Sequence, residues 1–347
     1  MTRGVAVLGM FTAHVGAAAA DVWSPTGWLQ VADGRSAAGF ALLAGVSAAL
    51  LSGGPEVLGG PDLRRARVRI LVRAALLLPL GLLLIALGTP VAVILPGYAL
   101  MFALVTVALS WSTRALLLVA GALLAVGPVL VASVSGEALP VPWVTELVVG
   151  RYYPAAVWMA YLLVGVAVGR IDLPAPGTAR RLATWGVVSA AVGYGTSAAL
   201  LPAVRPSDTL LRTLLSVEPH ANTAPEVVGN TGVVLCVLAL FLVTAPRFAL
   251  PLAPVAATGA LALTAYCGHL VAIALLGDQV VWAPSNARLL VFVVVTLAAT
   301  TAWRVMIGRG PLEQGLHRLS TAAARAVVPL PEPAPAASAG VSGDAAS

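Results

Sequence analysis

The chain has 347 residues, of which 59% are hydrophobic and only 10% are charged, and its mean hydropathy is +0.96. Soluble domains average about 25% charged residues, so this composition excludes a soluble globular protein and indicates a polytopic membrane protein of the all-α class. The net charge is +6, and all 20 basic residues are arginines. Because most of them lie between apolar runs, we attribute the charge to membrane topology and expect no nucleic-acid partner.

Ten apolar runs follow one another along the chain, each close to the roughly 20 residues that cross a bilayer as a helix. We therefore predict a transmembrane helical bundle with spans near 4–20, 36–53, 70–88, 91–111, 115–134, 154–169, 182–201, 228–245, 255–276 and 288–306.

Alternate loops and the two ends of the chain hold 15 of the 20 arginines, which predicts that both termini are cytoplasmic and that the membrane is the plasma membrane. We expect residues 1–310 to form the membrane domain and residues 311–347 to form a cytoplasmic tail. The Pro/Ala/Ser-rich end of this tail, from Pro329, is predicted to be disordered.

The first run also has features of a signal peptide, because a basic start and an apolar core precede an A-x-A pattern before Asp21. Thr12 and His14 interrupt the apolar core. We therefore favour a retained first span, whereas cleavage would remove the site described next.

Arg3 and His14 are 11 residues apart in this run. On a helix this spacing places them about 16 Å apart along the axis and only about 20° apart around it. The two side chains then share one stripe, with Arg3 at the membrane surface and His14 near mid-depth. Such a buried histidine is a catalytic candidate, or alternatively a neutral side chain hydrogen-bonded between helices.

Asp33 and Arg35 stand at the start of the second run. As structural residues, Asp33 and Gly34 would cap the helix. As functional residues, Asp33 would orient His14 or hold an acceptor, and Arg35 would bind an anion or a sugar. The pattern "AGFALLAGVSAALLSGG" that follows predicts close packing against a neighbouring helix.

Three further segments carry polar candidates. Tyr153 begins the sixth run, where it is a membrane-interface anchor or a substrate contact. His220 and Glu226 lie in "VEPHANTAPEVVGNTG", which we expect to line a pocket for a polar acceptor; the ligand set is too sparse to predict a metal site. His269 follows Tyr266 by three residues, as a second catalytic candidate or as an interhelical contact.

The pattern R-x10-H with Gly4 after the arginine resembles the first-helix motif of the integral-membrane acyltransferase superfamily, which includes the acyltransferase-3 enzymes. The blocks "RGVAVLGMFTAHV", "GRSAAGFALLAGVSAALLSGG", "YYPAAVWMAYLLVGVAVGR" and "GALALTAYCGHLVAI" are similar to actinobacterial proteins of the heparan-alpha-glucosaminide N-acetyltransferase-like family and of the related domain-of-unknown-function family 418. The resemblance extends to about residue 306.

This resemblance implies a multi-pass enzyme that moves an acyl group, such as acetyl, from cytosolic acyl-CoA to a sugar or lipid-linked acceptor of the cell envelope. His14 would be the general base or a transient acyl carrier. Acyl-CoA is then the co-substrate, its phosphates bound by arginines of the cytoplasmic side, namely Arg3, Arg64, Arg65 and Arg67. No metal is expected.

Two alternatives remain at this point. A transporter or flippase for a lipid-linked or acidic solute would use the same intramembrane histidine and arginine as a proton or substrate site. A non-catalytic membrane scaffold, or a homodimer of such chains, would use neither for chemistry. Membrane lipid is a partner in every case.

Overall fold

Helices make up the regular secondary structure of the computed structural model, which describes residues 1–134 and 142–329. No β-strand occurs within these ranges, which confirms the predicted all-α class. The described α-helices are α1 (Thr2–Val15), α2 (Arg35–Leu51), α3 (Gly60–Ile85), α4 (Leu95–Ala108), α5 (Thr113–Val134), α6 (Pro142–Val149), α7 (Ala155–Gly169), α8 (Thr178–Leu200), α9 (Thr209–Leu215), α10 (Ala224–Thr244), α11 (Ala253–Ala260), α12 (Ala262–Leu276), α13 (Gln279–Trp282), α14 (Asn286–Met306) and α15 (Pro311–Val327). Two short 3-10 helices, η1 (Gly27–Ala32) and η2 (Leu201–Ala203), precede α2 and follow α8.

Six of the described helices are long and apolar enough to cross a membrane, namely η1 with α2, α3, α5, α8 with η2, α10 and α14. A seventh candidate consists of α11 and α12, which are bent by 84° relative to each other at Leu261. The helices α4 and α7 are apolar but shorter, and α1 has 14 residues. Each of the ten predicted runs overlaps a helix, but length and composition alone support six or seven spans.

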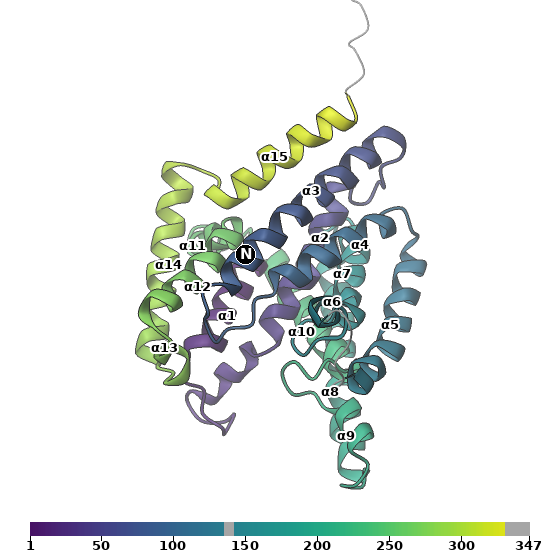
Figure 1. The fold of residues 1–347 in the computed structure, drawn as a ribbon, viewed down its shortest axis with the longest axis vertical. Helices are drawn as coiled ribbons and strands as arrows, with labels where there is room; N and C mark the ends of the chain where they lie inside the picture. Colours follow the sequence, from purple (N-terminus) through teal and green to yellow (C-terminus); the bar gives the residue numbers. More distant parts are fainter. Residues whose placement is uncertain (135–141, 330–347) are drawn as a thin grey trace, which may run out of the picture.

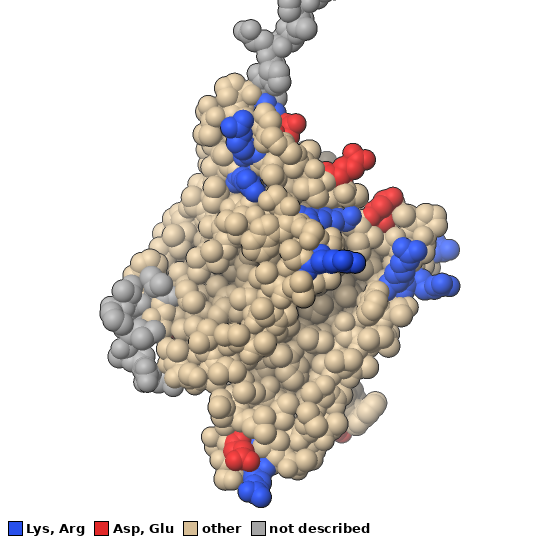
Figure 2. Space-filling view, turned by 90° about the vertical axis from the view of Figure 1, so that its right-hand side faces the viewer, with Lys and Arg blue, Asp and Glu red and all other residues tan. Residues whose placement is uncertain are grey.

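The surface of the molecule shows the charge separation that a membrane imposes. Figure 2 shows a broad band without Lys, Arg, Asp or Glu across the middle of one face, with charged side chains gathered at its two ends. Charged groups are costly in the hydrocarbon core and favourable at its borders, so this pattern is typical of a protein embedded in a bilayer.

The helix α7 lies at the centre of the fold and is buried along nearly its whole length. It packs closely on α2, because a Cβ atom on Gly165 would overlap the carbonyl oxygen of Leu42, and one on Gly45 would overlap that of Leu162. Only glycine allows the two backbones to approach this far. The predicted close packing of the second apolar run is therefore confirmed.

The first helix is surrounded by several others and does not form an outer wall. It packs on α2 and α11, and it also contacts α12 and α14. Gly4 makes the approach to α11 possible, since a Cβ atom there would overlap the carbonyl oxygen of Val255. In Figure 1, α1 lies inside the bundle with α11, α12 and α14 on the same side.

The segment expected to be a cytoplasmic tail begins with a well-defined helix. Figure 1 shows α15 lying across one end of the bundle beside α3. Arg65 on α3 fixes the end of α15, donating from Nε to the carbonyl of Val328 at 3.1 Å and from a terminal nitrogen to that of Pro329 at 2.7 Å. The disorder predicted beyond Pro329 concerns residues 330–347, which lie outside the described residues.

Candidate functional site

Arg3 and His14 both lie on α1, and each contacts a different helix. Arg3, in the first turn, donates to the Ser47 hydroxyl on α2 at 2.5 Å. His14, in the last turn, has its Nδ1 atom 3.1 Å from the Nε2 atom of His269 on α12. The predicted shared helix is correct, and its two polar groups face protein partners.

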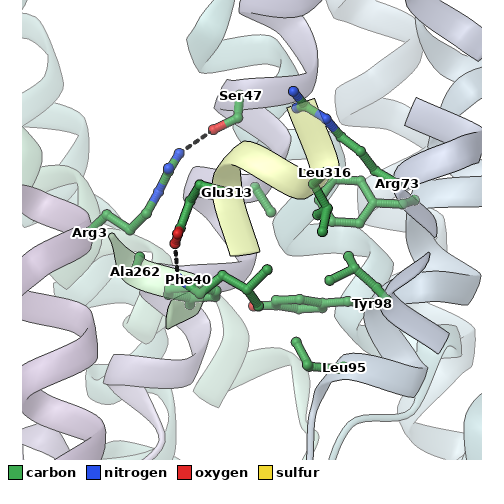
Figure 3. A pocket seen from close by; sticks show the side chains of 13 residues that line it. Arg3, Phe40, Ser47, Arg73, Leu95, Tyr98, Ala262, Glu313 and Leu316 are labelled. Atoms are coloured by element: carbon green, nitrogen blue, oxygen red, sulfur yellow. Dashed lines mark hydrogen bonds between the residues drawn. The ribbon is translucent and has the colours of Figure 1, made fainter. Parts of the chain in front are cut away.

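The Arg3 end of α1 opens into a cavity of about 260 Å³, which we call the arginine cavity. Its walls come from α1, α2, α3, α4, α12 and α15 (Figure 3). The polar side chains that line it are Arg3, Ser47, Arg73, Tyr98 and Glu313. It thus combines two cations with one carboxylate beneath the helix α15.

Glu313 connects the arginine cavity to the break between α11 and α12. Its Oε1 atom accepts from the backbone N–H of Leu263 at 2.7 Å and of Thr264 at 3.0 Å, and its Oε2 atom accepts from the Thr264 hydroxyl at 2.6 Å. These amides belong to the first turn of α12, where no intrahelical acceptor exists. A carboxylate from α15 therefore caps a helix about 50 residues earlier in the chain.

Sequence reasoning missed four of the polar residues that line the arginine cavity: Ser47, Arg73, Tyr98 and Glu313. The only signal for Glu313 was its place in the first turn after Gly310 and Pro311, which predicts a helix start but not a distant partner.

The arginines predicted to bind acyl-CoA phosphates are placed differently. Arg67 donates to the carbonyl of Thr106 at 3.0 Å and to the Ser110 hydroxyl at 3.1 Å, and Arg65 holds the end of α15. Arg64 is exposed. None of the three lines the arginine cavity, whereas Arg73, on the same helix, does.

The histidine pair is enclosed by aromatic side chains. His269 is buried, and its ring centroid lies 4.7 Å from that of Phe11 and 5.3 Å from that of Tyr266. The hydrogen bond to His14 requires one protonated nitrogen and one lone pair, so the two imidazoles share a single proton in it. If His14 donates from Nδ1, its Nε2 atom carries a lone pair and can accept a proton from a substrate.

The arginine cavity does not reach the histidine pair, because neither His14 nor His269 is among its lining residues. Aromatic rings connect the two regions. Phe40 lines the cavity and stacks on Tyr98 with ring centroids 5.9 Å apart; it also lies 6.5 Å from Tyr266, which contacts His269. A layer of packed rings thus separates the arginine cavity from the histidine pair.

Asp33 and Arg35 do not act as a pair in the structure. Gly34, at φ +68°, is the N-cap of α2, and the Asp33 side chain makes no capping bond. Arg35 donates to the Tyr194 hydroxyl at 2.8 Å, and this hydroxyl donates to Asn230 at 2.7 Å. Arg35 therefore ties α2 to α8 and α10, and the partner of His14 is His269, not Asp33.

The loop before α10 has an unusual backbone. His220 and Asn222 have φ values of +62° and +56°, in the left-handed region that is costly for most residues other than glycine. Glu226 holds both in place, because its carboxylate accepts from the N–H of His220 at 2.9 Å and of Asn222 at 2.7 Å. Glu226 is 3% exposed, so it is a scaffold for this loop and not a surface for an acceptor.

The strained backbone presents the His220 ring to an aromatic group. The ring stacks on Trp158 at 6.1 Å between centroids and meets Tyr153 edge-on at 5.3 Å. The Nδ1 atom of His220 lies 3.3 Å from the carbonyl oxygen of Tyr152. His220 is also within electrostatic range of His14, so three of the four histidines lie in one region.

Burial lowers the pKa of His220, and the carbonyl of Tyr152 partly offsets this effect. Within residues 1–134 and 142–329, no group of three or more His, Cys, Asp or Glu side chains is arranged to hold a metal ion. Comparison with protein-family models, with curated proteins and with solved structures finds no match for this chain.

Proposed function

We propose that the protein is a membrane-bound acyltransferase that takes an acyl group from acyl-CoA on the cytoplasmic side and transfers it to a sugar or lipid-linked acceptor of the cell envelope. One observation carries the proposal. The helix α1 begins at a cavity lined by two arginines and ends at a histidine that is hydrogen-bonded to a second histidine. In this proposal, donor binding at Arg3 and proton transfer at His14 use the two ends of one helix.

The proposed topology has ten passes with both termini in the cytoplasm. The arginine distribution along the sequence supports it, as does the charge-free band in Figure 2. The helices α1, α4 and α7 are too short to span a bilayer of about 30 Å unaided. Most residues of α4 and α7 are buried, and α1 packs on α2 and α11, so contacts with neighbouring helices support these short elements.

The donor site in this proposal is the arginine cavity. Arg3 and Arg73 offer charge-assisted hydrogen bonds to phosphate oxygens, which bind guanidinium groups in a bidentate manner. The flexible pantetheine arm would then pass the rings of Phe40 and Tyr266 toward His14. Movement of these rings is the step that connects the two regions.

The reaction needs one base and one proton path. The acceptor hydroxyl or amine gives its proton to Nε2 of His14 as its oxygen or nitrogen attacks the acyl carbonyl. The C–S bond of the thioester breaks, and the thiolate of CoA takes the proton from Nε2 of His14, so the histidine returns to its neutral state and protons and charge balance. His269 fixes the tautomer of His14 through the bond of 3.1 Å.

The acceptor side of the proposal is the His220 group. The partly exposed rings of Tyr153 and His220 provide an apolar surface with a polar edge, which suits a sugar ring, and the buried Trp158 packs behind His220. Because His220 lies within electrostatic range of His14, an acceptor held here would lie near the base.

The test uses inverted membrane vesicles that contain the full-length protein, supplied with radiolabelled acetyl-CoA. We expect label to enter the glycan or lipid fraction. His14→Ala should lower this transfer by about 100-fold to 10,000-fold, the usual effect of losing a general base. Glu56→Gln is the control, because Glu56 is exposed between α2 and α3 and does not line the cavity. Equal labelling in wild type and His14→Ala, at equal protein levels, would remove His14 from the mechanism.

One observation favours a transporter as the second candidate. The break of 84° between α11 and α12 resembles the discontinuous helices that form midplane substrate sites in transporters. The same vesicles distinguish the two functions, since a transporter or flippase would move a lipid-linked or acidic solute without releasing free CoA thiol from acetyl-CoA.

A further inference from the structure

The N-terminus of α12 is capped by the carboxylate of Glu313, which lies where a bound anion would lie. The first turn of a helix presents unpaired N–H groups and a partial positive charge, and it commonly binds phosphate or carboxylate groups. At α12 this position is taken by the Glu313 carboxylate, through the N–H groups of Leu263 and Thr264 and the Thr264 hydroxyl. Figure 3 shows Glu313 next to Arg3 at one side of the arginine cavity.

A single carboxylate does not balance the charge around it. Arg3 and Arg73 both line the cavity, and Arg73 is also within electrostatic range of Arg69 and Arg309. The Nε atom of Arg73 is buried without a hydrogen-bond partner among the described residues. Several positive charges thus surround one negative charge in a site of low polarity.

A second group in the cavity also lacks a partner. Tyr98 is 2% exposed, and its hydroxyl has no hydrogen-bond partner in the part of the chain that the structure describes. In Figure 3 its ring extends from α4 toward the side of the cavity where Arg3 and Glu313 lie. A buried hydroxyl without a partner is destabilising, so a ligand oxygen at this position would stabilise the site.

We propose that the α12 N-terminus, together with Arg3, Arg73 and Tyr98, is a binding site for the phosphoryl group of a ligand, and that Glu313 occupies this site until the ligand displaces it. A phosphoryl group carries more charge and more acceptor oxygens than a carboxylate, so it can bind the helix amides and both arginines at once. The cavity of about 260 Å³ is large compared with the roughly 30 Å³ of a water molecule and leaves room for it.

The displacement has a structural consequence. Glu313 is the only acidic residue in the first turn of α15, and its three hydrogen bonds attach the start of α15 to α12. Entry of a phosphoryl group would release this end of α15, while Arg65 continues to hold the other end. α15 then acts as a hinged cover over the cavity. That the phosphoryl group belongs to acyl-CoA rests on the proposed function, whereas the site itself does not.

The experiment measures binding of CoA to the full-length protein in detergent micelles by titration calorimetry, and follows hydrogen exchange of residues 311–327 by mass spectrometry. Glu313→Gln keeps the shape of the side chain but removes the competing charge. We expect this variant to bind CoA about tenfold more tightly, because the Glu313 carboxylate no longer repels the CoA phosphate. Its helix α15 should also show fast hydrogen exchange even without CoA. In wild type, CoA should increase this exchange.

Two variants complete the design. Glu56→Gln is the matched control, because it removes one negative charge from an exposed position between α2 and α3 and should leave CoA affinity and α15 exchange unchanged. Tyr98→Phe removes only the unpartnered hydroxyl and should weaken CoA binding several-fold while leaving α15 exchange without ligand unchanged.

The outcomes separate this inference from the proposed function. Equal CoA affinity and equal α15 exchange in wild type and Glu313→Gln would overturn the inference and leave the acyltransferase proposal standing. If CoA binds neither protein but phosphatidylglycerol vesicles release α15 in a Glu313-dependent manner, the site takes a lipid phosphate and the acyl-CoA donor is wrong. If CoA binds neither protein and neither CoA nor the vesicles affect α15, both proposals fail.

Discussion

The imidazole planes of His14 and His269 are nearly parallel, with an interplanar angle of 13° and 3.1 Å between Nδ1 of the first and Nε2 of the second. The bond crosses from α1 to α12, so it depends on the packing of two helices that are more than 200 residues apart in sequence. Because one proton serves both rings, the protonation state of one fixes the tautomer of the other. The pair is therefore expected to act as one catalytic unit.

Single and double variants test whether the two histidines act as one unit. His14→Ala and His269→Ala should each lower acetyl transfer in the vesicle assay, and the double variant should be no slower than His14→Ala alone. The reason is that a group that works only through its partner contributes nothing once the partner is lost. If the double variant instead loses transfer by the product of the two single losses, His269 contributes independently of His14.

The close contact between α2 and α7 gives a prediction for stability. Gly165→Ala should lower the melting temperature in detergent micelles, because the new Cβ atom would overlap the carbonyl oxygen of Leu42, and such overpacking costs about 1–3 kcal/mol. Gly121→Ala in α5 is the matched control, since a Cβ atom there has open space. Alanine favours helix over glycine by about 0.5–1 kcal/mol, so the control should raise the melting temperature slightly.

Local features of the sequence were sufficient to predict the helices and several of their contacts. Each of the ten predicted apolar runs overlaps a helix, because burial in a membrane requires continuous apolar stretches. The first apolar run predicted that Arg3 and His14 lie on one helix. The small residues around Gly45 predicted close packing, although the partner helix could not be named from the sequence.

Contacts between distant segments could not be predicted, and they define the candidate site. Glu313 caps α12 from about 50 residues away, and no local pattern links the two segments. The break at Leu261 was hidden inside one continuous apolar run, because hydropathy does not report a bend. His220 was noticed as polar, but its left-handed backbone depends on Glu226, whose role appears only in three dimensions.

Substitution of Tyr194 tests whether Arg35 has a structural role or binds the substrate. Tyr194→Phe removes the hydroxyl that links Arg35 to Asn230, leaving the guanidinium and the amide without this partner. We expect a loss of about 1–3 kcal/mol in stability and a lower melting temperature, with acetyl transfer per folded molecule unchanged. A large loss of transfer at unchanged stability would place Arg35 in the acceptor site.

The buried imidazole of His220 predicts a pH dependence of stability. Burial against Trp158 and Tyr153 lowers its pKa below the ordinary value of 6.5, so the unfolded chain takes up a proton at a higher pH than the folded protein does. Stability should therefore fall as the pH drops from about 6.5 toward the lowered pKa, because the unfolded state binds more protons in this window. His220→Asn keeps a residue type that tolerates the left-handed backbone but cannot titrate, and it should flatten the profile. Melting temperatures of both proteins between about pH 7.5 and pH 5 provide the measurement; parallel profiles would mean that another group titrates.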